Sequence, residues 1–260
     1  MNWRPDPAKG VFETLLVLDG RPVEWDAHLT RLRRSLAALY PDLAPPLLDL
    51  PSPTHPHGPA SDGTSAEALR ITVAPRTDGR LASTVKRRPA SGHFATENGG
   101  KPTARALSLR SIRLAGGLGA HKWADRSLLA EAQAALPAGT LPLIVDGDGT
   151  VLEASRANVF AVRDGTILTP PLDGRILPGV TRMRVLELAA ALDVETDEDP
   201  LSREDLLAAE EVFLTGSVRG VEPAAALDGA PLAGAGEIAV RLAAELRRAW
   251  TGLKTAASFG

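Results

Sequence analysis

The sequence predicts a mixed α/β fold of the α+β kind, in which strands, hairpins and single helices alternate along 260 residues. Apolar and β-branched runs of strand length recur along the chain, and Asp-Gly pairs typical of tight turns separate several of them. Other segments carry apolar residues three or four positions apart, which is typical of amphipathic helices. Because hairpins accompany the helices, we expect an α+β arrangement rather than a doubly wound parallel sheet.

The first half of the chain predicts one helix among strands and polar loops. Strands are expected over residues 10–20, 21–25 and 68–75, and loops over residues 41–65 and 86–105. The helix is expected over residues 26–39, where four leucines recur at helical spacing, with Asp26 as its N-cap. His55 and His57 lie in the first loop, but two ligands on a proline-rich loop make a poor metal site, so no metal is expected.

The second half repeats the alternation with more helices. We expect a strand over residues 106–114, hairpins with turns at 146–149 and 164–165, and a strand–turn–strand over 211–229. Helices are expected over about 124–136, over 174–192 after an entering loop, and over 235–250 at the end of the fold. These elements predict a small N-terminal α/β domain over 1–105, an interdomain connection over 106–118 and a larger C-terminal α/β domain over 119–260.

Composition narrows the class of protein. Lys and Arg total 29 and Asp and Glu total 32, so the net charge of −3 gives no reason to expect binding to nucleic acid or an anionic membrane. The absence of cysteine removes disulfides, thiolate nucleophiles and cysteine zinc sites. The N-terminus lacks the apolar segment of a signal peptide, and no apolar run reaches the length of a membrane span. We therefore expect a cytoplasmic protein.

Three features predict a site for an anion. "LPGVTR" (177–182) places a glycine directly before a helix, where backbone N–H groups and the helix dipole attract negative charge. "LTGSVRG" (214–220) places Ser217 in a turn flanked by glycines, and such turns can cradle phosphate oxygens. Arg31 lies close to the apolar face of the first predicted helix. Each feature alone is also compatible with an ordinary turn or a solvated arginine.

Two further residues raise the question of buried charge. Glu153 follows Val151 and Leu152 on an apolar strand, where a carboxylate costs free energy unless it has a partner. From the pattern alone, an exposed edge-strand position is the favoured interpretation. Lys122 lies between a glycine-rich loop and a predicted helix. It is either a solvated charge or an amine that is kept out of water for chemistry.

Six motifs in order carry a resemblance over nearly the whole chain. They are "GVFET", "HLTRL", "HKWADR", "VLEASRANVF", "ILPGVTR" and "FLTGSVRGVEP". Together they closely resemble the class IV aminotransferase family, the fold-type IV enzymes that use pyridoxal 5'-phosphate. The family includes branched-chain and D-amino acid aminotransferases and 4-amino-4-deoxychorismate lyase. The resemblance implies two α/β domains with the cofactor in the cleft between them, and a homodimer.

The resemblance also implies a role for each matching residue. Lys122 matches the catalytic lysine that bonds to the cofactor aldehyde, Glu153 the carboxylate beside the pyridine nitrogen, and Arg31 the arginine that binds the cofactor phosphate. The phosphate-binding backbone and hydroxyl groups match Val180, Thr181, Ser217 and Val218, and Asn158 is expected to orient the cofactor or the local backbone.

The reaction is predicted from details around these motifs. Transaminases of the family often carry a tyrosine five residues after the lysine, where this chain has Ser127, whereas Arg126 resembles the lyase branch. The start of the chain is similar to the lyase half of fused synthase–lyase proteins, which implies a functional link to an aminodeoxychorismate synthase. Arg126 and Arg219 are the expected contacts for substrate carboxylates, and Arg113 is either a third such contact or an exposed strand residue.

The favoured prediction is therefore a 4-amino-4-deoxychorismate lyase that releases pyruvate and p-aminobenzoate in the folate pathway. An amino-acid transaminase with the same cofactor is the first alternative. A non-catalytic relative that serves as a binding module is the second, and the retention of Lys122, Glu153 and Arg31 argues against it.

Overall fold

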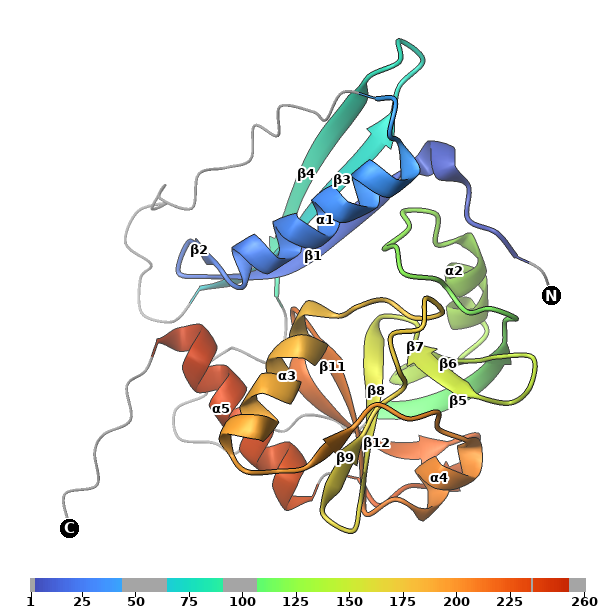
Figure 1. Ribbon diagram of the computed structural model, residues 1–260, viewed down its shortest axis with the longest axis vertical. Coiled ribbons are helices and arrows are strands. Elements are labelled where there is room, and N and C mark those ends of the chain that lie inside the picture. Colours follow the sequence, from blue (N-terminus) through green and yellow to red (C-terminus); the bar gives the residue numbers. More distant parts are fainter. Residues whose placement is uncertain (1–2, 44–64, 91–106, 235, 253–260) are drawn as a thin grey trace.

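The computed structural model describes residues 3–43, 65–90, 107–234 and 236–252. Within these residues the chain forms two sheets with helices against their faces (Figure 1), which confirms the predicted mixed α/β class. The predicted loop over 41–65, with His55 and His57, lies mostly outside the described residues.

The smaller sheet is antiparallel and has the order β2-β1-β3-β4. Its strands are β1 (Val11–Leu18), β2 (Arg21–Pro22), β3 (Ala66–Pro75) and β4 (Leu81–Pro89). A 3-10 turn, η1 (Pro7–Lys9), precedes β1, and helix α1 (Trp25–Leu39) lies along the sheet (Figure 1).

The larger sheet has nine strands, and six of them close into a ring. Strand β7 pairs with both β6 and β8, so the order β8-β11-β12-β5-β6-β7 returns to β8. Its strands are β5 (Leu107–Arg113), β6 (Thr140–Val145), β7 (Val151–Ala154), β8 (Ala157–Arg163), β9 (Thr166–Leu168), β10 (Thr196–Asp197), β11 (Glu211–Gly216), β12 (Gly220–Leu227) and β13 (Ala230–Pro231). Ring closure leaves β7 with neighbours on both sides, so β7 is not an edge strand.

In the part of the chain that the structure describes, four helices accompany the larger sheet. They are α2 (Ser127–Ala134), α3 (Val180–Ala191), α4 (Arg203–Ala208) and α5 (Glu237–Thr251). Helices α3 and α5 lie side by side against β11 and β12 (Figure 1). Phe160 and Phe213, cross-strand partners on β8 and β11, stack beneath them with ring centroids 5.0 Å apart. Among the described residues, none of the helices combines the length and the apolar character that crossing a bilayer requires.

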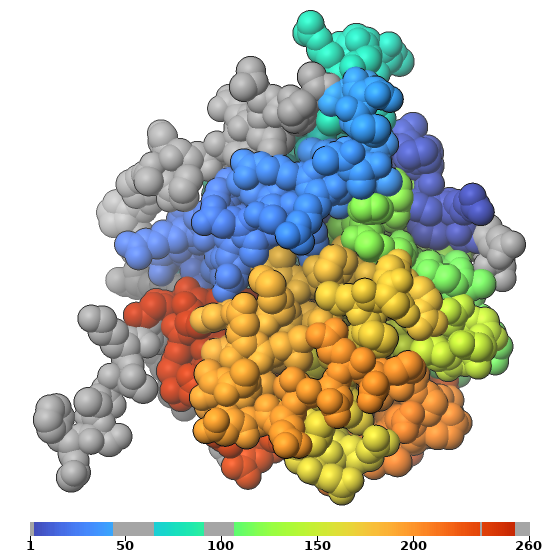
Figure 2. Space-filling model, in the orientation of Figure 1, coloured from blue at the N-terminus to red at the C-terminus, as the bar shows by residue number. Residues whose placement is uncertain are grey.

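Strand β1 is buried on both faces, which explains its unbroken apolar run. Side chains alternate along a strand, so Leu15 and Val17 pack with α1, whereas Leu16 and Leu18 join the cluster beneath α3 and α5. Strand β1 therefore belongs to the smaller sheet but also contributes side chains to the core of the larger one. Figure 2 shows the N-terminal part, in blue, seated directly on the C-terminal part.

Residues 107–113 are a strand inside the larger sheet, between β12 and β6, which confirms the strand predicted over 106–114. The domain bounds predicted around it stay a prediction. Two other expectations about the elements are corrected. Strand β4 continues to Pro89 into the loop predicted over 86–105, and it was missed because an edge strand with an exposed, basic second half lacks apolar alternation. The N-cap of α1 is Glu24, not Asp26, which lies in the first turn.

Glu211 attaches the start of α5 to the larger sheet. Its buried carboxylate, at the start of β11, accepts hydrogen bonds from the backbone N–H groups of Ile238 (2.9 Å) and Ala239 (2.8 Å) in the first turn of α5. We expect Glu211→Ala to lower the free energy of unfolding by about 2 kcal/mol, because two helix N–H groups lose their acceptor. Urea denaturation measures this.

The neighbouring exposed Glu210 provides the control for that measurement. Glu210→Ala should change stability by about 0.5 kcal/mol or less. Equal losses for the two variants would show that Glu211 does not anchor α5.

Candidate active site

A cavity of about 310 Å³ lies between the two sheets and collects most of the predicted site residues. The predicted residues in its lining are Arg31, Lys122, Arg126, Glu153, Asn158, Val180, Thr181, Ser217, Val218 and Arg219. They come from α1, the segment before α2, β7, β8, the start of α3 and the turn between β11 and β12. Segments that are distant in sequence therefore meet around one cavity.

Lys122 lies in an extended segment that pairs with the N-terminal end of β1. The backbone N–H of Phe12 donates to the Lys122 carbonyl (2.8 Å), and the N–H of Ala124 donates to the Gly10 carbonyl (2.9 Å). This pairing keeps the segment out of helical geometry, so α2 begins only at Ser127 rather than near 124 as predicted. The lysine is therefore held by strand-like pairing and not by a helix.

The amine of Lys122 is kept from water. Burial, followed by repulsion from Arg31, lowers the pKa of Lys122 to about 7. Its Nζ lies 5.1 Å from the ring centroid of Phe12. Near neutral pH a large share of Lys122 is therefore the neutral amine, which is the nucleophilic and proton-accepting form.

Glu153 is buried on β7, where the ring closure gives it Ile144 and Asn158 as cross-strand neighbours. The interpretation of Glu153 as an exposed edge residue is therefore wrong. Burial raises the pKa of Glu153 to about 7, although its Oε1 accepts a hydrogen bond from the Leu177 N–H (3.2 Å). A positively charged N–H group entering the cavity would supply the partner that a buried carboxylate requires.

Asn158 fixes the loop that leads into α3. Its Nδ2 donates to the Leu177 carbonyl (3.0 Å), so Glu153 and Asn158 hold both backbone groups of one residue. A β-carbon at Gly179 would lie only 2.0 Å from Asn158 Oδ1, so any larger residue there would displace the Asn158 amide. Asn158 therefore orients the backbone that enters α3, which is one of the two roles expected for it.

The start of α3 and the β11–β12 turn meet at the cavity wall. Thr181 Oγ1 donates to Ser217 Oγ (3.2 Å), and no side chain caps the first turn of α3. Beside them, Thr215 Oγ1 is buried and has no hydrogen-bond partner among the described residues. Uncapped helix N–H groups, two hydroxyls and an orphaned third hydroxyl suit an anionic ligand such as a phosphate.

Buried Glu13 holds Arg31 and is itself in contact with buried His28, and neither residue was expected from the sequence. Glu13 on β1 accepts from Arg31 Nε (2.8 Å) and Nη2 (2.6 Å), and its Oε2 lies 2.8 Å from His28 Nδ1. Burial alone would raise the pKa of Glu13, but the ion pair and hydrogen bonds with Arg31 together with those of His28 outweigh it and lower the pKa to about 2. The remaining nitrogen, Nη1, donates to the Pro178 carbonyl (2.9 Å), so Arg31 also connects α1 to the loop before α3.

Further cations surround Phe12. The guanidinium carbon of Arg70 lies 3.7 Å from the Phe12 ring centroid and that of Arg126 lies 6.0 Å away. Arg126 also donates to the Ser155 carbonyl. Burial, together with repulsion from neighbouring arginines, lowers the pKa values of both guanidinium groups. These arginines therefore gain from a negatively charged ligand between them.

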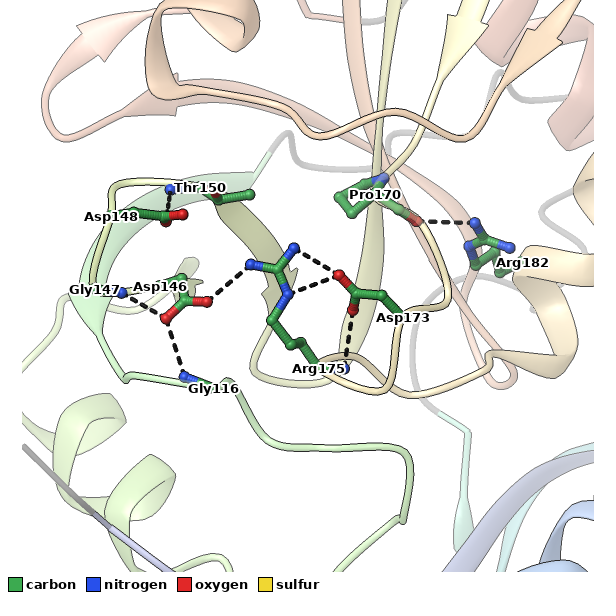
Figure 3. Close-up of polar contacts among 9 residues, drawn as sticks. All are labelled: Gly116, Asp146, Gly147, Asp148, Thr150, Pro170, Asp173, Arg175 and Arg182. Atoms are coloured by element: carbon green, nitrogen blue, oxygen red, sulfur yellow. Dashed lines mark hydrogen bonds and ion pairs between the residues drawn. The ribbon is translucent and has the colours of Figure 1, made fainter.

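An ion cluster outside the cavity joins two loops of the site, as Figure 3 shows. Arg175 pairs with Asp146 (2.8 Å) and with Asp173 (2.6 Å), and Asp146 also accepts from the Gly116 N–H (3.0 Å). The Gly119 N–H donates to the Arg175 carbonyl (3.1 Å). The glycine-rich loop before the lysine and the loop before α3 are thus fixed to each other.

The sequence leaves two interpretations open for Arg113, a contact with substrate or an exposed position on a strand. Arg113 does not line the cavity, because β5 directs its guanidinium to the Gly147 carbonyl (3.0 Å) at the surface. The exposed-strand interpretation of Arg113 is therefore the one the structure supports. The described residues contain no group of three or more His, Asp or Glu side chains able to hold a metal ion.

Comparisons with known proteins place this arrangement among relatives. The family model for amino-transferase class IV matches residues 10–227. The branched-chain-amino-acid aminotransferase of Escherichia coli (strain K12) is 39% identical over 87 residues, which is 34% of this chain and 28% of that protein. This chain thus covers less than a third of the length of that curated relative.

Solved structures cover more of the chain. A hypothetical aminotransferase from Mycobacterium tuberculosis, in its alpha-ketoglutarate and PMP bound form, superposes with a TM-score of 0.75 at 25% identity over 94% of this chain and 90% of that one. The 4-amino-4-deoxychorismate lyase from Pseudomonas aeruginosa gives 0.71 at 25% identity over 92% and 90%. The similarity therefore supports the family but does not choose between an aminotransferase and a lyase.

The buried amine predicts a stability difference that depends on pH. An unfolded lysine has a pKa near 10.5, so between pH 7 and 10 the unfolded state binds more protons than the folded state, and stability attributable to Lys122 rises with pH. We expect cofactor-free Lys122→Met to be more stable than the parent below pH 7. This advantage should shrink as the pH rises towards 10. Thermal denaturation across this pH range measures it.

Exposed Lys86 gives the matched control, since Lys86→Met removes an amine that is already in water. The control should show no such pH dependence. An advantage of Lys122→Met that stays constant from pH 6 to pH 10 would mean that the amine is hydrated in the folded protein.

Proposed function

Since the chain belongs to the class IV aminotransferase family, whose enzymes depend on pyridoxal phosphate, we propose that it is a 4-amino-4-deoxychorismate lyase. The observation that carries this proposal is the charge of the cavity. Among the described residues, its lining includes six arginines and one carboxylate, Glu153. Glu13 and Glu222 pair with three of these arginines, so guanidinium groups still outnumber carboxylates around the cavity. The substrate of such a lyase carries two carboxylates, and a dianion beside a phosphate suits this surplus of positive charge.

The residues present fit the cofactor. Arg31, the start of α3 and Ser217 offer donors for its phosphate, and the orphaned Thr215 hydroxyl would gain a partner. Buried Glu153 would hold the protonated ring nitrogen, which relieves the cost of its burial. Bound there, pyridoxal phosphate supplies an aldehyde that captures the substrate amine and a ring that accepts electron density from the adjacent carbon.

Lys122 would do the proton chemistry. Its Nζ, largely neutral near pH 7 because burial lowers its pKa, takes the proton from the ring carbon that carries the substrate amine. The C–O bond to the enolpyruvyl group then breaks and the ring becomes aromatic, which yields p-aminobenzoate. The leaving enolate takes up a proton at its methylene carbon and becomes pyruvate. Arg126, four residues after Lys122 and largely buried, holds a substrate carboxylate so that this carbon faces the amine.

An amino-acid transaminase is the second candidate, and a specific observation favours it. The curated relative from Escherichia coli is a branched-chain-amino-acid aminotransferase. Against it, a branched aliphatic side chain gains nothing from the arginines around Phe12. A homodimer, a cytoplasmic location and a functional link to an aminodeoxychorismate synthase remain parts of the proposal.

The deciding experiment is turnover of aminodeoxychorismate by the enzyme loaded with pyridoxal phosphate. We expect stoichiometric pyruvate and p-aminobenzoate, and no product from Lys122→Ala, because that variant lacks the amine that moves the proton. Conversion of the bound cofactor to its amine form by branched-chain or D-amino acids, without release of pyruvate from aminodeoxychorismate, would establish the transaminase instead. A colourless protein that takes up no cofactor would support a non-catalytic binding module.

Glu13 should set the affinity for the cofactor phosphate through Arg31. Glu13→Gln keeps the shape but removes the charge that holds two guanidinium nitrogens, so we expect pyridoxal phosphate to bind about tenfold more weakly. Fluorescence titration of the cofactor-free protein measures this. Pyridoxal, which has no phosphate, should bind the variant and the parent alike. An equal loss for both ligands would mean that Glu13 acts only through stability.

A further inference from the structure

A second cluster of charge stands at the rim of the cavity, apart from Lys122 and Glu153. Arg156 lies in the two-residue turn between β7 and β8, and Arg219 lies in the turn between β11 and β12. Both arginines line the cavity. Their side chains are 34% and 38% exposed, whereas Glu153 is buried and Lys122 is half-buried.

One buried carboxylate organises both guanidinium groups. Glu222 on β12, whose side chain is 4% exposed, pairs with Arg156 Nη1 (3.0 Å) and Nη2 (3.5 Å) through its two oxygens. Its Oε1 also accepts from Arg219 Nη1 (3.2 Å). A buried carboxylate at this position requires such partners, and in return it fixes the direction of both arginines.

Arg156 has hydrogen-bond donors to spare in this cluster. Burial lowers the pKa of Arg156, and repulsion from Arg219 and Arg88 adds to that effect. A guanidinium has five N–H donors, and the paired nitrogens of Arg156 use only part of that set on Glu222. An anion at the rim would therefore meet donors whose direction Glu222 fixes.

We propose that Arg156 and Arg219, positioned by Glu222, form a subsite that binds a second carboxylate of the substrate and selects dicarboxylates over monocarboxylates. This inference rests on the proposed function, because it assumes that the reacting end of the substrate lies deep in the cavity at Lys122. The opposite end of a molecule anchored there extends towards the rim, where the two turns present their arginines. Glu222 is a positioning residue that acts through both.

The test compares two probes on the enzyme loaded with pyridoxal phosphate. Isophthalate carries two carboxylates on a six-membered ring and benzoate carries one, and calorimetry gives the affinity for each. The parent should prefer isophthalate, and Arg156→Ala or Arg219→Ala should weaken isophthalate about 10- to 100-fold while benzoate changes by about twofold or less. Glu222→Gln should reduce the same preference, with cofactor absorbance unchanged.

Arg163 at the far end of β8 provides the matched control, since it is exposed, pairs with Asp205 (3.1 Å) and does not line the cavity. Arg163→Ala should leave both affinities as in the parent. With aminodeoxychorismate, the rim variants should raise KM about tenfold or more and change kcat little, because they alter binding and not the proton transfer.

Equal weakening of both probes, or no preference in the parent, would overturn the subsite. If the protein takes up no cofactor or releases no pyruvate, the proposed function fails instead. The same calorimetry on the cofactor-free protein then still decides whether the two arginines recognise a second carboxylate.

Discussion

Backbone pairing between the start of β1 and the lysine segment is the interaction on which the site depends. Two hydrogen bonds join residues 10–12 to residues 122–124, and Asp125 next to them accepts from the Asp6 N–H (3.0 Å) and Lys9 Nζ (2.9 Å). A segment that follows the larger sheet's first strand in sequence is thereby built onto the smaller sheet. The cavity exists because this pairing closes the space between the sheets over a buried amine.

Within the cavity, ion pairing neutralises one charged group, whereas burial shifts the pKa values of two others. Arg31 is neutralised by Glu13, whereas Lys122 and Glu153 are both displaced by burial from their ordinary protonation behaviour. The ion pair makes Arg31 a rigid hydrogen-bond donor. Lys122 and Glu153, in contrast, can change their protonation when a charged ligand binds beside them. A cofactor with a phosphate at one end and a ring nitrogen at the other complements both arrangements at once.

The sequence was sufficient for most elements and for the residues that the family motifs contain, such as Lys122 and Glu153. Their environment was not predictable in the same way, since the burial of Glu153 results from the closure of β7 onto β8, a long-range property of the sheet. Glu13 had a detectable signal, because it stands on the same strand face as the apolar residues that pack with α1. Glu222 and Arg156 had none, since 66 residues separate them and both look like surface charges. The position of Arg113 was unpredictable for the same reason, because its contact with the Gly147 carbonyl joins segments that are distant in sequence.

The closed ring of strands also separates two kinds of residue in a way that bears on how such enzymes diversify. Glu153 and Asn158 are parts of ladders whose register cannot shift without opening the ring. Arg156 and Arg219 protrude from short turns that interrupt no ladder. Replacements at these turns can therefore change the preference for substrate, while the register of the ring keeps Glu153 and Asn158 in place.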